Sequence, residues 1–133
     1  MQQDYKYYDI TGRIIGAAMY VHNALGSGFQ EVIYQRALEI EFSYRNLSCK
    51  REYEMPIWFR EVQIGTRRVD FLVENNISVE IKAIIKLEDV HLAQAINYLE
   101  AYNLEIGLLL NFGSKSMQVK RLLNSKFNAR KKI

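Results

Sequence analysis

Three side chains close together in the sequence have the chemistry to bind a metal ion and act on a phosphate: Asp70, Glu80 and Lys82. Hard carboxylate oxygens suit Mg²⁺ or Mn²⁺, which take one or two carboxylates and complete their shells with waters and substrate phosphates. A lysine beside such an ion can orient or deprotonate a water, or stabilise charge in the transition state. The spacing also occurs often by chance, so an ordinary hairpin with a solvated salt bridge is the alternative.

These three residues lie in a predicted β-hairpin, RRVDFLVENNISVEIKA, at residues 67–83. Apolar and polar residues alternate on both sides of the turn residues 74–76, as in two strands. A three-residue loop places Asp70 opposite Glu80, whereas a loop of two or four residues would move Asp70 to the apolar face. The predicted pairs are Val73–Ile77, Leu72–Ser78, Asp70–Glu80 and Arg68–Lys82. The predicted apolar face contains Val69, Phe71, Val73, Ile77, Val79 and Ile81.

The composition predicts one globular domain: the chain has 133 residues, of which 49% are apolar and 25% charged. No apolar run is long enough to span a membrane, and the polar N-terminus lacks a signal-peptide pattern. We therefore expect no membrane association and a cytoplasmic location. The single cysteine, Cys49, excludes an intrachain disulfide and a cysteine-based zinc site.

Charge is unevenly distributed along the chain. Residues 1–111 carry 11 basic and 15 acidic residues, whereas residues 112–133 carry 7 basic residues and no acidic one. The basic C-terminal tail, from about residue 124, is either an electrostatic contact surface for nucleic acid or a solubilising tail.

The remaining elements follow from periodicity and from turn residues. Ser27 and Gln30 have the spacing of a capping box, which predicts that a helix starts at Ser27. The apolar run at residues 106–112 predicts a strand buried on both faces. The predicted elements are helices at 9–25, 27–45 and 87–102, strands at 49–53, 56–63, 67–73, 77–82, 106–112 and 117–122, a turn at 64–66, and a tail beyond Asn124 that frays or forms a short helix.

Six short motifs occur in a characteristic order along the chain: GFQEVIY at 28–34, RVD at 68–70, VEIKA at 79–83, HLAQ at 91–94, NYL at 97–99 and GLLLNFG at 107–113. Together with the predicted order of elements, these motifs resemble the PD-(D/E)xK nuclease superfamily, which has the restriction-endonuclease-like fold. They also resemble the GxxExxY family, a small bacterial family assigned to that superfamily. Gln94 and Tyr98 further resemble the QxxxY element of RecB-type exonucleases. The resemblance covers roughly residues 10–123.

The resemblance implies an α/β fold with a restriction-endonuclease-like αβββαβ core, in which helices flank a mixed central sheet. It also implies a role for each motif residue, although no proline precedes Asp70 where the superfamily's name places one. The implied metal ligands are Asp70, Glu80, the Ile81 carbonyl and, directly or through water, Glu31. The implied catalytic residues are Glu31, Asp70, Glu80, Lys82, Gln94 and Tyr98, with Lys82 acting on the attacking water and Gln94 and Tyr98 orienting the metal shell or the phosphate.

The activity that the resemblance implies is a nuclease dependent on Mg²⁺ or Mn²⁺ that hydrolyses nucleic acid, DNA rather than RNA. Because a small chain has no separate DNA-binding domain, a homodimer or a partner protein is expected. Two alternatives stay open, a non-catalytic binding module that keeps the fold and a phosphohydrolase acting on small nucleotides.

Other residues also have two interpretations from sequence. His91 is either a second metal ligand or a residue of the helix start, and Gly28 either belongs to the site or lets two helices approach. Tyr34 and Tyr98 are either site residues or large packing residues. Trp58 and Phe59 either stack on bases or pack on a helix.

Overall fold

The computed structural model describes residues 7–129. Five strands form one mixed sheet in the order β1-β2-β3-β4-β5, in which only β3 and β4 are parallel. The αβββαβ core is thus confirmed, with one further helix and one further strand. The elements are α2 (Tyr8–Leu25), α3 (Glu31–Tyr44), β1 (Cys49–Phe59), β2 (Val62–Val73), β3 (Ile77–Lys82), α4 (Asp89–Tyr102), β4 (Ile106–Asn111) and β5 (Gln118–Leu123).

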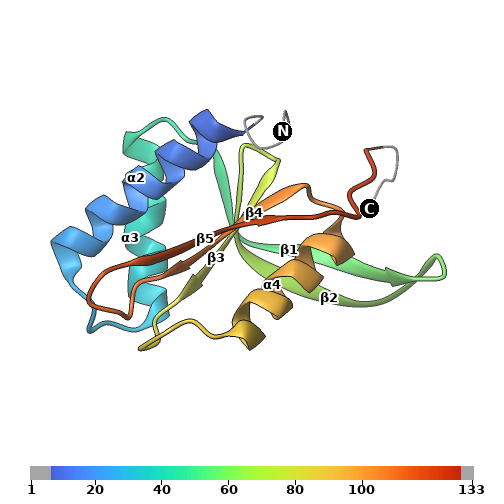
Figure 1. Cartoon of the computed structure of the whole chain (residues 1–133). Helices are drawn as coiled ribbons and strands as arrows, with labels where there is room; N and C mark the ends of the chain where they lie inside the picture. Colours follow the sequence, from blue (N-terminus) through green and yellow to red (C-terminus); the bar gives the residue numbers. More distant parts are fainter. Residues whose placement is uncertain (1–6, 130–133) are drawn as a thin grey trace.

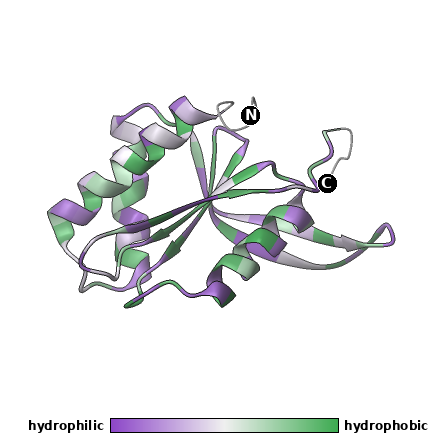
Figure 2. Ribbon diagram, in the orientation of Figure 1, coloured by the Kyte–Doolittle hydropathy of each residue, from purple (hydrophilic) through white to green (hydrophobic). Residues whose placement is uncertain are grey.

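The sheet separates a large apolar core from two smaller clusters. Figure 1 shows α2 and α3 side by side at one end of the sheet, with α4 lying apart from them. Side chains of α2 and α3 pack on one face of the central strands, whereas those of α4 pack on the other. Green hydrophobic segments run through the central strands in Figure 2. Within residues 7–129, no helix has the length and apolar character needed to cross a membrane.

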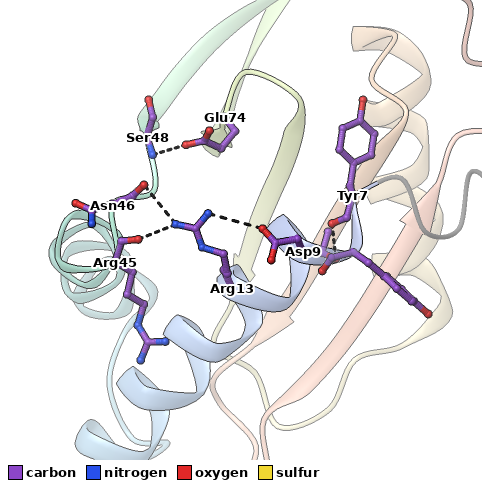
Figure 3. Close-up of polar contacts among 9 residues, drawn as sticks. Tyr7, Asp9, Arg13, Arg45, Asn46, Ser48 and Glu74 are labelled. Carbon is purple, nitrogen blue, oxygen red and sulfur yellow. Dashed lines mark hydrogen bonds and ion pairs between the residues drawn. The ribbon is translucent and has the colours of Figure 1, made fainter.

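The hairpin of β2 and β3 has the predicted register at its closed end. Val73 pairs with Ile77, and the next two pairs follow the predicted order. The Glu74 carboxylate accepts a hydrogen bond from the Ser48 backbone N–H at 2.7 Å, which fixes the turn against the start of β1 (Figure 3). Arg13 of α2 donates to the Arg45 carbonyl at 2.8 Å in the same region. The polar contacts at this end position the turn of the hairpin.

Two strand predictions before the hairpin are wrong. Residues 49–59 form one strand through Pro56, and the turn lies at Arg60 and Glu61, which both have positive φ, rather than at residues 64–66. Pro56 lies in an edge strand, the position in a sheet where proline is tolerated. The chain therefore has three strands, not four, between α3 and α4.

The distal parts of β1 and β2, residues 54–68, pair only with each other and form an arm that projects beyond the sheet in Figure 1. Trp58 and Phe59 lie on this arm, and both are exposed. Their exposure leaves both sequence interpretations, stacking on bases and packing on a helix, as predictions.

Two predicted chain ends differ from the structure. Helix α3 begins at Glu31 with Gln30 as its N-cap and without a side-chain capping bond, so the capping box at Ser27 is wrong. In the tail, residues 124–129 neither form a helix nor fray, because the buried Asn124 amide donates to the Leu99 and Leu104 carbonyls. The remaining predicted tail, residues 130–133, lies outside the described residues.

Candidate active site

Asp70 lies where strands β2 and β3 separate. The ladder between them ends at the Phe71–Val79 pair, so Asp70 and Glu80 are not the ladder partners that the sequence predicted. Instead, the Asp70 carboxylate accepts a hydrogen bond from the Ile81 backbone N–H at 2.7 Å. Its other oxygen accepts one from the Gln35 amide of α3 at 3.1 Å. The carboxylate is thus held between two strands and a helix by two donors.

The alternation of β2 also breaks at Asp70. Val69 packs with Leu72 and Tyr102 on the α4 side, whereas Phe71 packs in the large core, so the prediction that Val69 shares a face with Phe71 is wrong. Glu52, between the Arg51–Phe71 and Tyr53–Val69 pairs of β1, has a φ of 51°. A left-handed residue in an edge strand is a local irregularity of the kind that redirects side chains beside functional sites.

Glu80 is a buried carboxylate with too few partners. It is 8% exposed, and its Oε1 is buried with no hydrogen-bond partner. Burial and, second to it, the negative charge of Asp70 raise the pKa of Glu80 to about 8, although Arg67 and Lys82 oppose the shift. Two neighbouring carboxylates in a desolvated place repel each other, and this favours a proton or a cation between them.

Arg67 is the site residue that the sequence analysis missed. Its guanidinium lies 3.9 Å from Glu80 Oε2 and 4.3 Å from the centre of the Tyr98 ring. The hairpin pattern gave Arg67 no role, because it lies beyond the last β2–β3 pair and reaches Glu80 only through the three-dimensional course of β2. The one available signal was a third basic residue in the motif-bearing hairpin.

Lys82 and Glu31 complete the charged group. Lys82 lowers the pKa of Glu31, Asp70 and Glu80, although burial raises all three overall. Glu31, the first residue of α3, also interacts with Asp70 and Glu80. The four residues named from sequence therefore lie close enough to change one another's ionisation.

The predicted Gln94 and Tyr98 line the opposite side of the same site. The Gln94 amide donates to the Tyr98 hydroxyl at 2.9 Å, one turn later on α4. A cavity of about 10 Å³ lies between these residues, Glu80 and Lys82, which is room for about one water. Gln94 and Tyr98 thus face the charged residues from the helix, as a site role requires.

Of the two interpretations of His91, the structure supports a role at the start of helix α4. It closes a capping box with Glu88, in which the His91 Nδ1 accepts a hydrogen bond from the Glu88 backbone N–H at 2.9 Å. Tyr34 is buried and stacks on Phe112 with ring centres 4.8 Å apart. A Cβ at Gly28 would meet nothing within 4 Å, so close helix approach is the wrong explanation for that glycine.

The donor set fits a divalent cation that keeps solvent ligands. Residues 7–129 hold no cluster of three or more His, Cys, Asp or Glu side chains able to hold a metal ion by themselves. Mg²⁺ does not require one, since it is commonly held by one or two carboxylates plus waters and phosphate oxygens. The unpartnered Glu80 Oε1 beside the Asp70 carboxylate is the kind of oxygen that such an ion takes.

Comparison with known proteins agrees with this geometry. Residues 8–122 match the model of the PD-(D/E)XK nuclease superfamily. No curated protein sequence matches the chain. The solved structure titled "Crystal structure of SSO0001" is similar in fold, with a TM-score of 0.52 and 20% identity over 69% of this chain. The match spans about half of that structure's length, 48%. The family match covers most of the sequence, and the chain therefore belongs to the PD-(D/E)XK nuclease superfamily.

Proposed function

We propose that this protein is a metal-dependent nuclease that hydrolyses phosphodiester bonds, with DNA rather than RNA as its substrate. Superfamily membership supports a nuclease-type function in general. The observation that carries the finer proposal is the mutual interaction of Glu31, Asp70, Glu80 and Lys82, with one Glu80 oxygen buried and unpartnered.

Each residue has a specific task under this proposal. Asp70 and Glu80, with the Ile81 carbonyl, would hold Mg²⁺ or Mn²⁺, and Glu31 would reach it directly or through water. The bound ion supplies Lewis-acid polarisation of the phosphate and an activated water. Lys82 orients that water and stabilises the charge that develops on the phosphate oxygens. Gln94 and Tyr98 orient the phosphate from α4.

The hydrogen bonds to Asp70 support the metal assignment. The Gln35 amide and the Ile81 N–H use one lone pair of each carboxylate oxygen and leave the others for a cation. Both donors also fix the direction of the carboxylate, in the way that outer-shell partners orient metal ligands. We propose further that the chain is a GxxExxY-type member of the superfamily, with Gln94 and Tyr98 as its RecB-type element.

The decisive experiment compares wild type with Lys82→Ala on single- and double-stranded DNA and RNA, with Mg²⁺ or Mn²⁺. Because Lys82 acts mainly on the transition state, its loss should lower turnover about 10²–10³-fold and change substrate affinity little. Lys50→Ala, at an exposed lysine of β1 that does not line the cavity of Glu80 and Lys82, is the matched control and should keep turnover and substrate affinity.

One observation favours a second function. Arg67 lies 3.9 Å from Glu80 and partly balances its charge without any metal, as in a structural site. A non-catalytic nucleic-acid-binding module would keep this pair. Wild type that binds nucleic acid with either metal but cuts none of the four substrates would establish that alternative.

A further inference from the structure

An open groove of about 850 Å³ lies beside the charged residues and is not used by the chemistry proposed above. One wall is the loop at residues 26–30, which leads directly into Glu31. The other wall is the loop at residues 83–88, which follows Lys82. His91 lines both this groove and the small cavity of Glu80 and Lys82, so the two spaces adjoin at this residue.

The first wall is held in place by Tyr34. Its buried hydroxyl donates to the Gly26 carbonyl at 2.5 Å and accepts from the Phe29 backbone N–H at 3.1 Å. The Phe29 ring packs edge-on against the Tyr34 ring, with centres 6.2 Å apart, and is still 49% exposed. A half-exposed aromatic ring thus lines the groove on a fixed backbone.

The second wall is held by Asn111, which is fully buried. Its amide group accepts from the Ile84 N–H at 3.0 Å and donates to the Ile84 carbonyl at 2.9 Å. Gly113 fits tightly below, since a Cβ there would lie 2.3 Å from the Ile84 nitrogen. The next residue, Ile85, is 89% exposed and lines the groove. Both walls are therefore pre-formed, which reduces the ordering cost of binding.

The lining combines apolar surfaces with hydrogen-bond donors. Phe29 and Ile85 supply the apolar part, and Lys86 supplies a positive charge. The His91 Nδ1 accepts from the Glu88 backbone N–H, so the proton of the neutral ring is on Nε2, which is a donor and not a metal ligand. Exposed apolar side chains beside a cation and a donor match a ligand with flat bases and phosphates.

We propose that this groove binds the unpaired nucleotides next to the scissile phosphate, with a base against Phe29 and Ile85 and a phosphate oxygen bound by His91 Nε2–H and Lys86. The inference rests on the proposed function, because the groove adjoins the site of that function. It specifies the substrate as a single strand, a frayed end or a flap. In a duplex the base faces are stacked and covered, whereas unpaired bases are available to stack on aromatic side chains.

The test is binding of a fluorescently labelled oligothymidylate and a duplex of equal length, measured by anisotropy in an Asp70→Asn background that cannot cleave. The Asp70→Asn protein with an unchanged groove should bind the single strand more tightly than the duplex. Phe29→Ala should weaken that binding about 5- to 150-fold, the range for one stacked base, and Phe29→Trp should preserve it. Duplex binding should be the same in all variants.

Two further variants separate the groove from other effects. Ile85→Ala removes a side chain with little packing to lose and should also weaken single-strand binding. Tyr44→Ala is the matched control, because Tyr44 is an exposed aromatic residue about 20 Å away at the other end of α3. Equal affinity of Phe29→Ala and Tyr44→Ala for the single strand would overturn the inference, as would wild type that prefers the duplex.

The outcomes distinguish this inference from the proposed function. Phe29-dependent binding of the single strand by a protein that never cleaves would support the groove and contradict the nuclease. Lys82-dependent cleavage that is unchanged in Phe29→Ala and Ile85→Ala would support the nuclease and contradict the groove.

Discussion

The two faces of strand β3 differ sharply although both are buried. Ile77, Val79 and Ile81 point into the large core, are at most 2% exposed and pack there among apolar side chains. Ser78, Glu80 and Lys82 point toward α4, where Glu80 is buried beside Arg67 and Lys82. One strand thus combines a face that stabilises the fold with a face that concentrates charge.

The difference shows how the fold supports a costly site. Buried apolar side chains each contribute about 1.5–3 kcal/mol, whereas a desolvated carboxylate beside another one destabilises the folded state. Active sites are commonly places where local stability is sacrificed for function. The core face of β3 and the charged face should therefore respond in opposite directions to substitution.

The largest expected effect is the pH dependence of the metal-free protein. The pKa of Glu80 is raised from 4.5 to about 8, so the folded state holds this proton more tightly than the unfolded chain. Protonated Glu80 is therefore tolerated below pH 4.5, and the free energy of unfolding falls by up to about 5 kcal/mol as the pH rises from 4.5 to 8. Urea unfolding in EDTA across this range measures the loss. Glu80→Gln should flatten the profile, and an unchanged slope in that variant would assign the effect to other groups.

A substitution in the large core should lower the free energy of unfolding at every pH. Phe71 is fully buried and packs edge-on against Phe42, with ring centres 5.2 Å apart. Phe71→Ala should cost about 3–5 kcal/mol of unfolding free energy, measured by chemical denaturation. Phe59→Ala on the exposed arm is the control and should change stability by less than about 0.5 kcal/mol. Similar losses in both variants would show that the arm is also buried, for example in a dimer.

Metal binding should reduce the repulsion between the Asp70 and Glu80 carboxylates. Mg²⁺ or Mn²⁺ at about 100 times its Kd should stabilise the fold by about 2.7 kcal/mol, seen as a rise in Tm. The rise should be larger at pH 8 than at pH 6, since the ion competes with protons for the carboxylates. Asp70→Asn should abolish the metal response and can stabilise the metal-free protein. A normal response in Asp70→Asn would place the ion elsewhere.

The smallest expected effect concerns the basic tail, which follows strand β5 along the chain. If Lys126, Arg130, Lys131 and Lys132 bind phosphates, changing them to Gln should reduce the salt slope of nucleic-acid binding by about 0.7–0.9 for each phosphate that is no longer bound. The last three lie outside the described residues. Turnover at saturating substrate should be unchanged. An identical slope would identify the tail as solubilising.

Much of the fold could be predicted because local patterns agree with it. The register at the closed end of the hairpin follows from a two-residue period and a three-residue loop, and both are confirmed. The run at 106–112 predicts a strand buried on both faces, and all six residues of β4 are buried. Two of the errors occurred at Pro56 and Ser27, where residue type favoured a boundary that the tertiary structure did not use.

The sequence by itself determined which side chains are candidates for the site, apart from Arg67, because acids, a lysine and two polar residues of α4 occur in a recognisable order. Only the tertiary structure decided how they are arranged. Asp70 leaves the ladder to bind the Ile81 N–H, and Arg67 reaches Glu80 from beyond the last strand pair. Likewise, two loops distant in sequence form one groove because Tyr34 and Asn111 each hold one of them. Hydrogen bonds and desolvation depend on distances between chain segments, and those distances are set by packing, not by local residue patterns.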